Sequence, residues 1–194
     1  SISDPVIRLA AGDYKLTILG NGDTVSGYAF RLFDLASAAA VTPGQLVAGT
    51  LSPANMTEAY QFQIESPGEY YFDSRSVSGL ANAHWRLISP SGGITFSASA
   101  TSDVGPVALG PGTHTIMVEG YQGDTGSGTY SFNIQPVASG VGALVLGDVN
   151  SGTLATAGAR RAYTFSLVAP ATLYLDSLTN AGSILWSLDG PSGS

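Results

Sequence analysis

The sequence repeats itself, and this repeat constrains the fold more than any other feature of the chain. Residues 44–74 align without a gap with residues 147–177, at a separation of 103 positions. Twelve of the thirty-one aligned positions are identical, which excludes a chance match. The identical pairs are Gly44/Gly147, Gly49/Gly152, Thr50/Thr153, Leu51/Leu154, Ala54/Ala157, Ala59/Ala162, Tyr60/Tyr163, Phe62/Phe165, Pro67/Pro170, Tyr71/Tyr174, Asp73/Asp176 and Ser74/Ser177. We therefore expect two copies of one structural unit.

Further matches set the size of this unit. Downstream the separation falls to 101, and near the N-terminus it is 100 to 102. The matching residues are Trp85/Trp186, Pro90-Ser91-Gly92/Pro191-Ser192-Gly193, Leu9/Leu109, Gly22-Asp23-Thr24/Gly123-Asp124-Thr125, Tyr28/Tyr130 and Phe30/Phe132. A unit of about one hundred residues is too long for a solenoid repeat and has the size of an autonomous domain.

Apolar and polar residues alternate within the unit. Tyr60, Phe62 and Ile64 are separated by glutamines, the period-two pattern of a strand with one buried face. Eight such segments between turns predict an all-β fold of tandem jelly-roll-like β-sandwich repeats of about 100 residues. The predicted strands are Gln45–Leu51, Tyr60–Ile64, Glu69–Asp73, His84–Ile88, Ile94–Ser97, Val104–Leu109, His114–Val118 and Tyr130–Ile134. Residues 34–40, rich in alanine, are expected to be a linker with one helical turn.

The separations also predict how the chain is divided. Residues 37–139 are expected to form one complete sandwich, residues 1–36 the C-terminal half of one repeat, and residues 140–194 the N-terminal half of the next. Each half alone exposes apolar faces and unpaired strand edges. Two explanations stay open. Either the halves of different chains complete one another head to tail, or the halves continue covalently into neighbouring repeats of a longer polypeptide.

The composition excludes several classes of function. Only 11% of residues are charged, and fourteen Asp and Glu against seven Lys and Arg give a net charge of −7, so nucleic acid is not an expected partner. The absence of cysteine excludes disulfides, thiolate nucleophiles and cysteine-ligated metals. The sequence contains no apolar run long enough to span a membrane, and we expect any export signal to lie outside these residues.

Five motifs follow one another through the central unit. They are Tyr-Gln-Phe at 60–62, Pro-Gly-Glu-Tyr-Tyr-Phe at 67–72, Trp-Arg-Leu-Ile-Ser-Pro-Ser-Gly at 85–92, a segment at 109–121 that begins Leu-Gly-Pro-Gly-Thr, and Gly-Thr-Tyr-Ser-Phe at 128–132. In this order they resemble the bacterial pre-peptidase C-terminal domain. The resemblance implies a jelly-roll-like sandwich on an extracellular bacterial protein, either behind a secreted peptidase or repeated in a large surface protein. Some relatives bind calcium or matrix polymers, but no acidic cluster here matches such a site.

Residues for catalysis are not evident. Hydrolytic chemistry needs a nucleophile with a base or two facing carboxylates. The chain has two histidines, His84 and His114, and neither recurs at the matching position of another copy. We therefore expect no enzymatic activity and no cofactor, and we interpret both histidines as residues of strand faces.

Four aspartates recur between copies. Asp73 and Asp176 stand at predicted strand ends, and Asp23 and Asp124 stand in Gly-Asp-Thr turns. Calcium needs six to eight oxygen ligands, and no run of alternating aspartates supplies them. Turn capping explains the same pattern. We expect no metal site and no calcium requirement for folding, with Asp73 as the best candidate if a calcium site exists.

Aromatic residues provide the candidate binding sites. Tyr70, Tyr71 and Phe72 are consecutive, so at least one ring must face outward from a strand. We expect Tyr70 or Tyr121 to be the exposed ring, and take Tyr70, Tyr71 and Tyr121 as candidate ligand-binding residues. Trp85 and its copy are expected in the core rather than on a platform for stacking sugars.

Together these patterns predict a structural or adhesive repeat segment of a bacterial cell-surface or secreted protein, assembling head to tail into a fibre where split sandwiches complete one another. The alternative is a carbohydrate- or matrix-binding accessory module of a secreted hydrolase. The expected partners are neighbouring repeats, other copies of the chain, or an extracellular glycan or matrix. The expected location is extracellular or on the bacterial surface.

Overall fold

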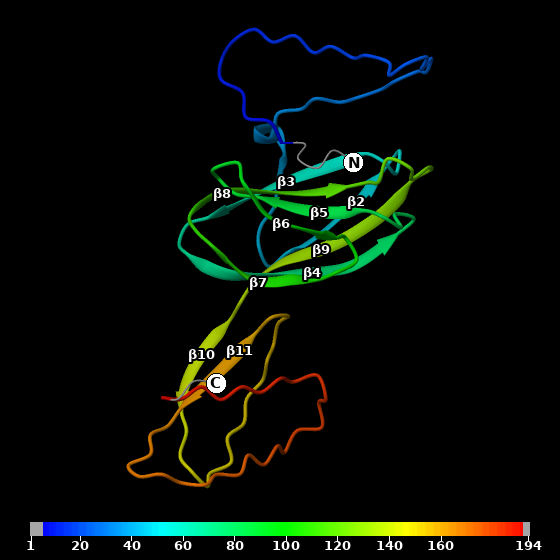
Figure 1. Ribbon diagram of the computed structural model, residues 1–194. Helices are drawn as coiled ribbons and strands as arrows, with labels where there is room; N and C mark the ends of the chain where they lie inside the picture. Colours follow the sequence, from blue (N-terminus) through cyan, green and yellow to red (C-terminus); the bar gives the residue numbers. More distant parts are fainter. Residues whose placement is uncertain (1–5, 192–194) are drawn as a thin grey trace.

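A β-sandwich occupies the middle of the computed structural model, which describes residues 6–191 (Figure 1). All eight predicted strands are present, several of them longer than expected. They are β2 (Leu46–Leu51), β3 (Thr57–Ile64), β4 (Gly68–Ser78), β5 (His84–Ile88), β6 (Ile94–Ser99), β7 (Val104–Leu109), β8 (Gly112–Glu119) and β9 (Gly128–Pro136). Within residues 6–191 there is no α-helix, and hence no helix that could cross a membrane.

The strands form two sheets whose order interleaves the two halves of the unit. The five-stranded sheet has the order β1-β3-β8-β5-β6, and the four-stranded sheet has the order β2-β9-β4-β7. Eight antiparallel strands in two such sheets make a jelly-roll sandwich, and β1 (Ala39–Ala40) is added parallel to β3 at one edge. Every antiparallel ladder joins a strand from β2–β5 to one from β6–β9. Neither half therefore contains two strands that are neighbours in a sheet.

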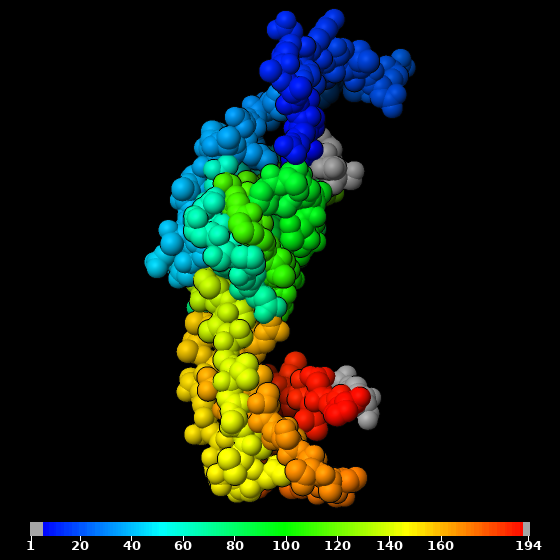
Figure 2. Space-filling model, turned by 90° about the vertical axis from the view of Figure 1, so that its left-hand side faces the viewer, coloured from blue at the N-terminus to red at the C-terminus, as the bar shows by residue number. Residues whose placement is uncertain are grey.

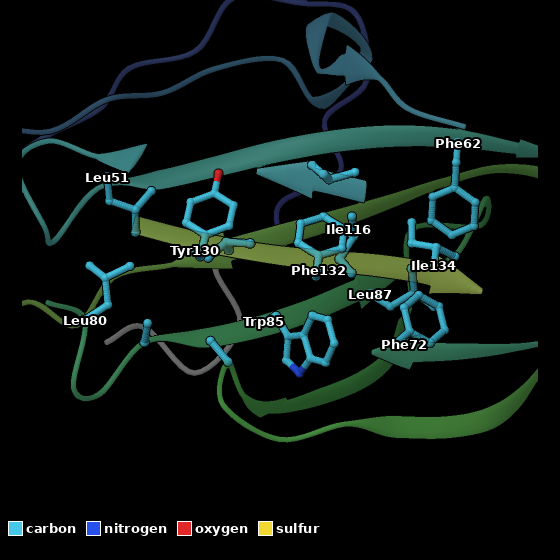
Figure 3. Close-up of a cluster of buried hydrophobic side chains, with 14 of the residues drawn as sticks. Leu51, Phe62, Phe72, Leu80, Trp85, Leu87, Ile116, Tyr130, Phe132 and Ile134 are labelled. Atoms are coloured by element: carbon cyan, nitrogen blue, oxygen red, sulfur yellow. The ribbon is translucent and has the colours of Figure 1, made fainter. Parts of the chain in front are cut away.

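Aromatic side chains fill the space between the sheets (Figure 3). Trp85 is 1% exposed, which confirms its predicted place in the core. Its ring meets those of Phe72, Phe96 and Phe132 edge to face, with centroids 5.9 to 6.3 Å apart. Burial of each large side chain contributes about 1.5–3 kcal/mol, so this cluster supplies much of the stability of the sandwich.

The expected linker is part of the sandwich rather than a free spacer. It contains the single 3-10 turn η1 (Leu35–Ser37), capped by the Asp34 side chain, which accepts a hydrogen bond from the Ala36 N–H. With the start of the chain it covers an apolar patch on the outer face of the five-stranded sheet. The covered residues are Ala59, Ile88 and Met117, and the covering residues are Val6, Phe33, Leu35 and Ala38. The same outer face carries the ion pair between Arg86 and Glu119, at 3.1 Å.

The flanking segments form few strands. Residues 6–34 contain none, and residues 137–191 contain the parallel pair of β10 (Ser139–Ala143) and β11 (Arg160–Thr164). The two segments extend from opposite sides of the sandwich (Figure 1, Figure 2). We expected two half-sandwiches here, and the paucity of strands follows from the interleaved strand order. The division of the chain at residues 36 and 139 stays a prediction.

Candidate functional site

The flanking segments expose apolar side chains whose counterparts in the sandwich are buried. Trp186 is 59% exposed where Trp85 is 1% exposed, and Phe30 is 61% exposed where Phe132 is 2% exposed. Trp186 thus does not occupy a core within this chain. The other large apolar residues that are exposed at positions buried in the sandwich are Leu9, Tyr14, Leu16, Ile18, Tyr28, Leu32, Leu154, Leu167, Leu175 and Leu188. These side chains belong to the apolar faces that the same positions bury in the sandwich.

The strand order explains why these segments stay open. Residues 6–34 align with β7, β8 and β9, and residues 149–191 align with β2 to β5. In the sandwich, each of β7, β8 and β9 is bordered only by strands from β2–β5. Within residues 6–191, neither flanking segment contains the strands that border its counterpart in the sandwich, and the ladder found in these segments is β10–β11.

The β10–β11 ladder repeats the β1–β3 ladder in register. β1–β3 pairs Ala39 with Tyr60, and β10–β11 pairs Gly142 with Tyr163, each residue 103 positions later. Three backbone hydrogen bonds recur at the same separation. In each, a backbone N–H donates to a backbone carbonyl. The Val41 N–H donates to Gln61 (2.8 Å), and its counterpart Leu144 donates to Thr164 (2.9 Å). Likewise, Gln45 donates to Thr42 (3.1 Å) as Asp148 does to Val145 (3.2 Å), and Met56 donates to Pro53 (2.9 Å) as Ala159 does to Thr156 (3.1 Å). The repeated sequence thus has a repeated local backbone geometry.

A hydroxyl pair joins the two sheets of the sandwich. Tyr60 Oη on β3 lies 2.6 Å from Tyr130 Oη on β9. A side chain at Gly49 on β2 would collide with the Tyr130 hydroxyl and lie 2.8 Å from the Tyr60 hydroxyl, so only glycine fits. Burial, and then the hydrogen bond with Tyr60, raise the pKa of Tyr130 far above its ordinary value.

These three residues have counterparts of the same type in the flanking segments. Gly152 and Tyr163 correspond to the glycine and the β3 tyrosine, and Tyr28 corresponds to the β9 tyrosine. A Cβ placed on Gly152 would lie 3.5 Å from the Tyr163 hydroxyl, which is ordinary contact. Two members of the set therefore lie in the C-terminal segment and the third in the N-terminal segment.

The three tyrosines predicted to bind a ligand do not converge. Tyr70 on β4 packs against the core, as its spacing of two from Phe72 requires, and the outer-face ring of this run is Tyr71. Of the two rings expected as alternatives for the exposed one, Tyr70 or Tyr121, the structure exposes Tyr121 and partly buries Tyr70. Tyr121 is 43% exposed in the loop between β8 and β9, whereas Tyr71 pairs with Gln135 at the far end of β9.

Tyr71 is held by a residue that the sequence did not single out. Its hydroxyl donates to Asp103 Oδ2 at 3.0 Å, and the N–H of Ser74 donates to Asp103 Oδ1 at 2.8 Å. Partial burial, followed by the bond to Asp103, raises the pKa of Tyr71. The ring also lies against Gly158 of the C-terminal segment, which covers part of its surface.

The remaining polar candidates are engaged locally. Asp73 pairs with Arg75 at 3.0 Å, and no cluster of three or more His, Asp or Glu occurs within residues 6–191. His114 is buried, stacks on Phe62 at 5.5 Å between centroids, and has its Nε2 3.0 Å from the Gly110 carbonyl. This is a packing role for His114.

A shallow hollow of about 440 Å³ lies between the loops at residues 79–81 and 123–125. Its wall includes Asp124, whose buried Oδ2 has no hydrogen-bond partner. The predicted turn cap is thus not made by that oxygen, and the Asp124 N–H instead donates to the Tyr121 carbonyl at 2.9 Å. The Tyr121 ring lies against Gly123, at the edge of the hollow.

Comparisons with known proteins found similar solved structures only. No family model and no curated protein matches the chain. The pre-peptidase C-terminal domain of a collagenase from Bacillus anthracis is 19% identical, with a TM-score of 0.43, over 51% of this chain and 95% of that one. PliG, a periplasmic inhibitor of g-type lysozyme, is similar at a TM-score of 0.36 in both Aeromonas hydrophila (13% identity, 51% and 100% covered) and Salmonella Typhimurium (19% identity, 51% and 99% covered). The first belongs to the family that the motifs resemble.

Proposed function

We propose that the chain is a structural, non-catalytic segment of a bacterial cell-surface or secreted protein, in which β-sandwich repeats of about one hundred residues follow one another and serve adhesion. The observation that carries this proposal is the recurrence of the β1–β3 ladder as β10–β11, with register and hydrogen bonds shifted together by 103 positions. The two copies are therefore alike in backbone geometry as well as in sequence.

Contacts at both joints support a stiff rather than a freely jointed array. The linker before β2 is packed on the outer face of the following sheet, and Gln61 Nε2 donates to the Leu35 carbonyl at 2.7 Å. After β9, Arg160 pairs with Glu69 on β4, and the Val137 N–H donates to the Glu69 carbonyl at 2.8 Å. Each joint is therefore tied to the sandwich beside it.

The absence of catalysis and the extracellular location are parts of the same proposal. The packing of His114 in the core and the low share of charged residues, 11%, support the first. The cysteine-free, low-charge composition and the motif resemblance support the second.

Small-angle scattering on one copy and on two joined copies of this sequence tests the proposal. Each added repeat should lengthen the particle by about 30–40 Å, the length of a strand of eight or nine residues plus its joint. A maximum dimension that does not grow with copy number would contradict a linear array.

The hollow beside Tyr121 favours a second candidate function, a carbohydrate- or matrix-binding accessory module. An exposed ring next to small polar walls suits stacking on a sugar. Glycan binding that Tyr121→Ala abolishes and Tyr71→Ala leaves unchanged would favour this module. Binding lost equally in both variants would exclude the hollow as its site.

A further inference from the structure

We propose that the hollow between the β4–β5 and β8–β9 loops binds neutral or amine-bearing sugars of a glycan, and that Asp124 makes it reject acidic sugars. The loops that form this site are longer than their counterparts in the other copies of the unit. The inference rests on the second candidate function, a carbohydrate-binding module. It adds to that function the class of sugar and the residue that selects it.

The loop between β4 and β5 is longer in the sandwich than in the C-terminal copy. Trp85 follows Asp73 by twelve positions, whereas Trp186 follows Asp176 by ten. The stretch with the two extra positions contains the connection between the two strands, and residues 79–81 of this connection wall the hollow. A length that one copy has and another lacks is not required by the fold that they share.

The loop between β8 and β9 is also longer in the sandwich, here by comparison with the N-terminal copy. Asn21 stands alone between two glycines in that copy, whereas Tyr121 and Gln122 stand between the matching glycines of the sandwich. The Tyr121 ring is 43% exposed and lies against Gly123, in the wall of the hollow. The two longer loops thus meet at one hollow. Insertions that particular repeats carry on one face often mark a binding face.

The walls of the hollow define the chemistry of its ligand. Thr101 and Thr125 contribute hydroxyl groups, Ala81 is small, and Tyr121 adds an exposed ring at the edge. A ring with polar groups beside it suits a sugar, whose C–H face stacks on the ring while its hydroxyls make hydrogen bonds. The volume of about 440 Å³ lies within the range of small-molecule sites.

Asp124 gives the hollow an uncompensated negative charge. Among the residues that line the hollow, Asp124 is the one with a charged side chain, and it takes part in none of the ion pairs found within residues 6–191. A carboxylate accepts hydrogen bonds from hydroxyl and ammonium groups and repels another carboxylate. Neutral sugars and amino sugars therefore fit the site, and uronic acids do not.

The contacts that tie the flanking segments to β4 and to the turn after β5 lie away from the hollow. Arg8 Nη1 donates to the Ser91 carbonyl at 2.8 Å, in the turn that follows β5. Arg160 pairs with Glu69, near the start of β4. The hollow adjoins the end of β4 and precedes β5, so it lies at the opposite end of both strands. These joints therefore leave it accessible to a glycan.

Titration calorimetry of the full chain with paired oligosaccharides tests the inference. Oligomers of glucose, mannose and galactose are each compared with oligomers of the corresponding uronic acid, and an oligomer of glucosamine is compared with that of glucuronic acid. At least one neutral or amine-bearing oligomer should bind, and its acidic partner should bind at least about tenfold more weakly.

Substitution of Asp124 separates a selecting role from a structural one. Asp124→Asn should bring the acidic and neutral partners to within about threefold of each other, because it removes the repelling charge. It should not lower the thermal unfolding midpoint, because Asp124 Oδ2 is buried with no hydrogen-bond partner. The matched control is Asp73→Asn, whose carboxylate pairs with Arg75 on β4 and does not line the hollow. This control should keep the discrimination of the unmodified chain.

Two further changes test the ring and the longer loop. Tyr121→Ala should weaken binding by about tenfold, and Tyr121→Phe, which keeps the ring, should bind like the unmodified chain. Deletion of Ala81 and Asn82, both exposed, gives the loop the length of the C-terminal copy and should abolish binding. If this deletion lowers the thermal midpoint, the Asp124→Asn result decides.

The outcomes distinguish this inference from the functions proposed above. Equal binding of acidic and neutral partners, or unchanged discrimination in Asp124→Asn, would overturn the inference and leave a carbohydrate-binding module standing, provided that Tyr121→Ala still abolishes or weakens binding. No binding of any oligomer at millimolar concentration would overturn both the inference and the module. The repeat array would be untouched by either result, because the scattering experiment tests it separately.

Discussion

The central sandwich and the flanking segments carry copies of the same residues in opposite environments. Leu87 is fully buried and Leu188, at the matching position, is 70% exposed. The difference lies in which strands each segment contains, because every antiparallel ladder among β2–β9 joins the first half of the unit to the second. The C-terminal segment does form β10–β11, the counterpart of β1–β3, because both strands of that ladder are present in the segment. Strand sequence is thus insufficient for strand formation when its partners lie in a different half.

The largest expected effect comes from removing a tryptophan in each region. Trp85→Ala should destabilise the sandwich by about 3–5 kcal/mol, because it removes a ring with three aromatic contacts from a closed core. Trp186→Ala should change the sandwich by less than about 0.5 kcal/mol, because its ring is 59% exposed. Urea unfolding followed by far-UV circular dichroism measures both. Similar losses in the two variants would mean that Trp186 is packed in the same cooperative unit.

Two ion pairs, one within the sandwich and one to the N-terminal segment, should differ in their contribution to stability. Arg86 and Glu119 are 8% and 14% exposed, so Glu119→Ala leaves a buried charge and should cost about 2–4 kcal/mol. Glu58 pairs with Arg31 of the N-terminal segment at 3.8 Å, with both side chains at least 40% exposed, and Glu58→Ala should cost less than about 1 kcal/mol. The urea midpoints of the two variants give the result. A large effect of Glu58→Ala would show that the N-terminal segment is fixed more firmly than its exposure indicates.

Glycine substitution compares the two copies of one position. Gly49→Ala forces a methyl group into the Tyr60 and Tyr130 hydroxyls and should destabilise the sandwich by about 1–3 kcal/mol. Gly152→Ala meets ordinary contact with Tyr163 and should leave the thermal midpoint of the sandwich unchanged. Differential scanning calorimetry decides between the two. An unaffected Gly49→Ala variant would place the hydroxyl pair away from this glycine.

The smallest effect is a pH dependence confined to the sandwich. The pKa of Tyr130 is raised on folding, so the neutral hydroxyl stabilises the fold fully below the unfolded value of about 10, and this contribution is lost as pH rises toward the folded value. Between pH 9 and 10.5 the loss should be less than about 1 kcal/mol. Tyr130→Phe should flatten this decline in the urea midpoint, whereas Tyr28→Phe should not. Equal slopes in the two variants would remove Tyr130 as the source.

Much of the sandwich could be predicted from the sequence, but its polar contacts could not. Alternation placed β3 and β9, the turns between them delimited the other six strands, and the repetition of Trp85 placed it in the core. Alternation could not give β1, since two alanines have no pattern, nor the partnership of Tyr71 with Asp103, which are 32 residues apart. The choice between Tyr70 and Tyr121 as the exposed ring stayed open because consecutive aromatics do not reveal which of them faces inward until Phe72 is known to be buried.

The sequence by itself determined the length of the unit, the strand positions and the sequence similarity between the flanking segments and the sandwich. All three follow from local residue patterns and from the spacing between them. The tertiary structure alone decided that the ladders interleave the two halves, and therefore which copies are buried and which are left open. The physical reason is that a strand is stabilised by hydrogen bonds and packing from neighbours in space, and in this fold those neighbours are distant in the chain.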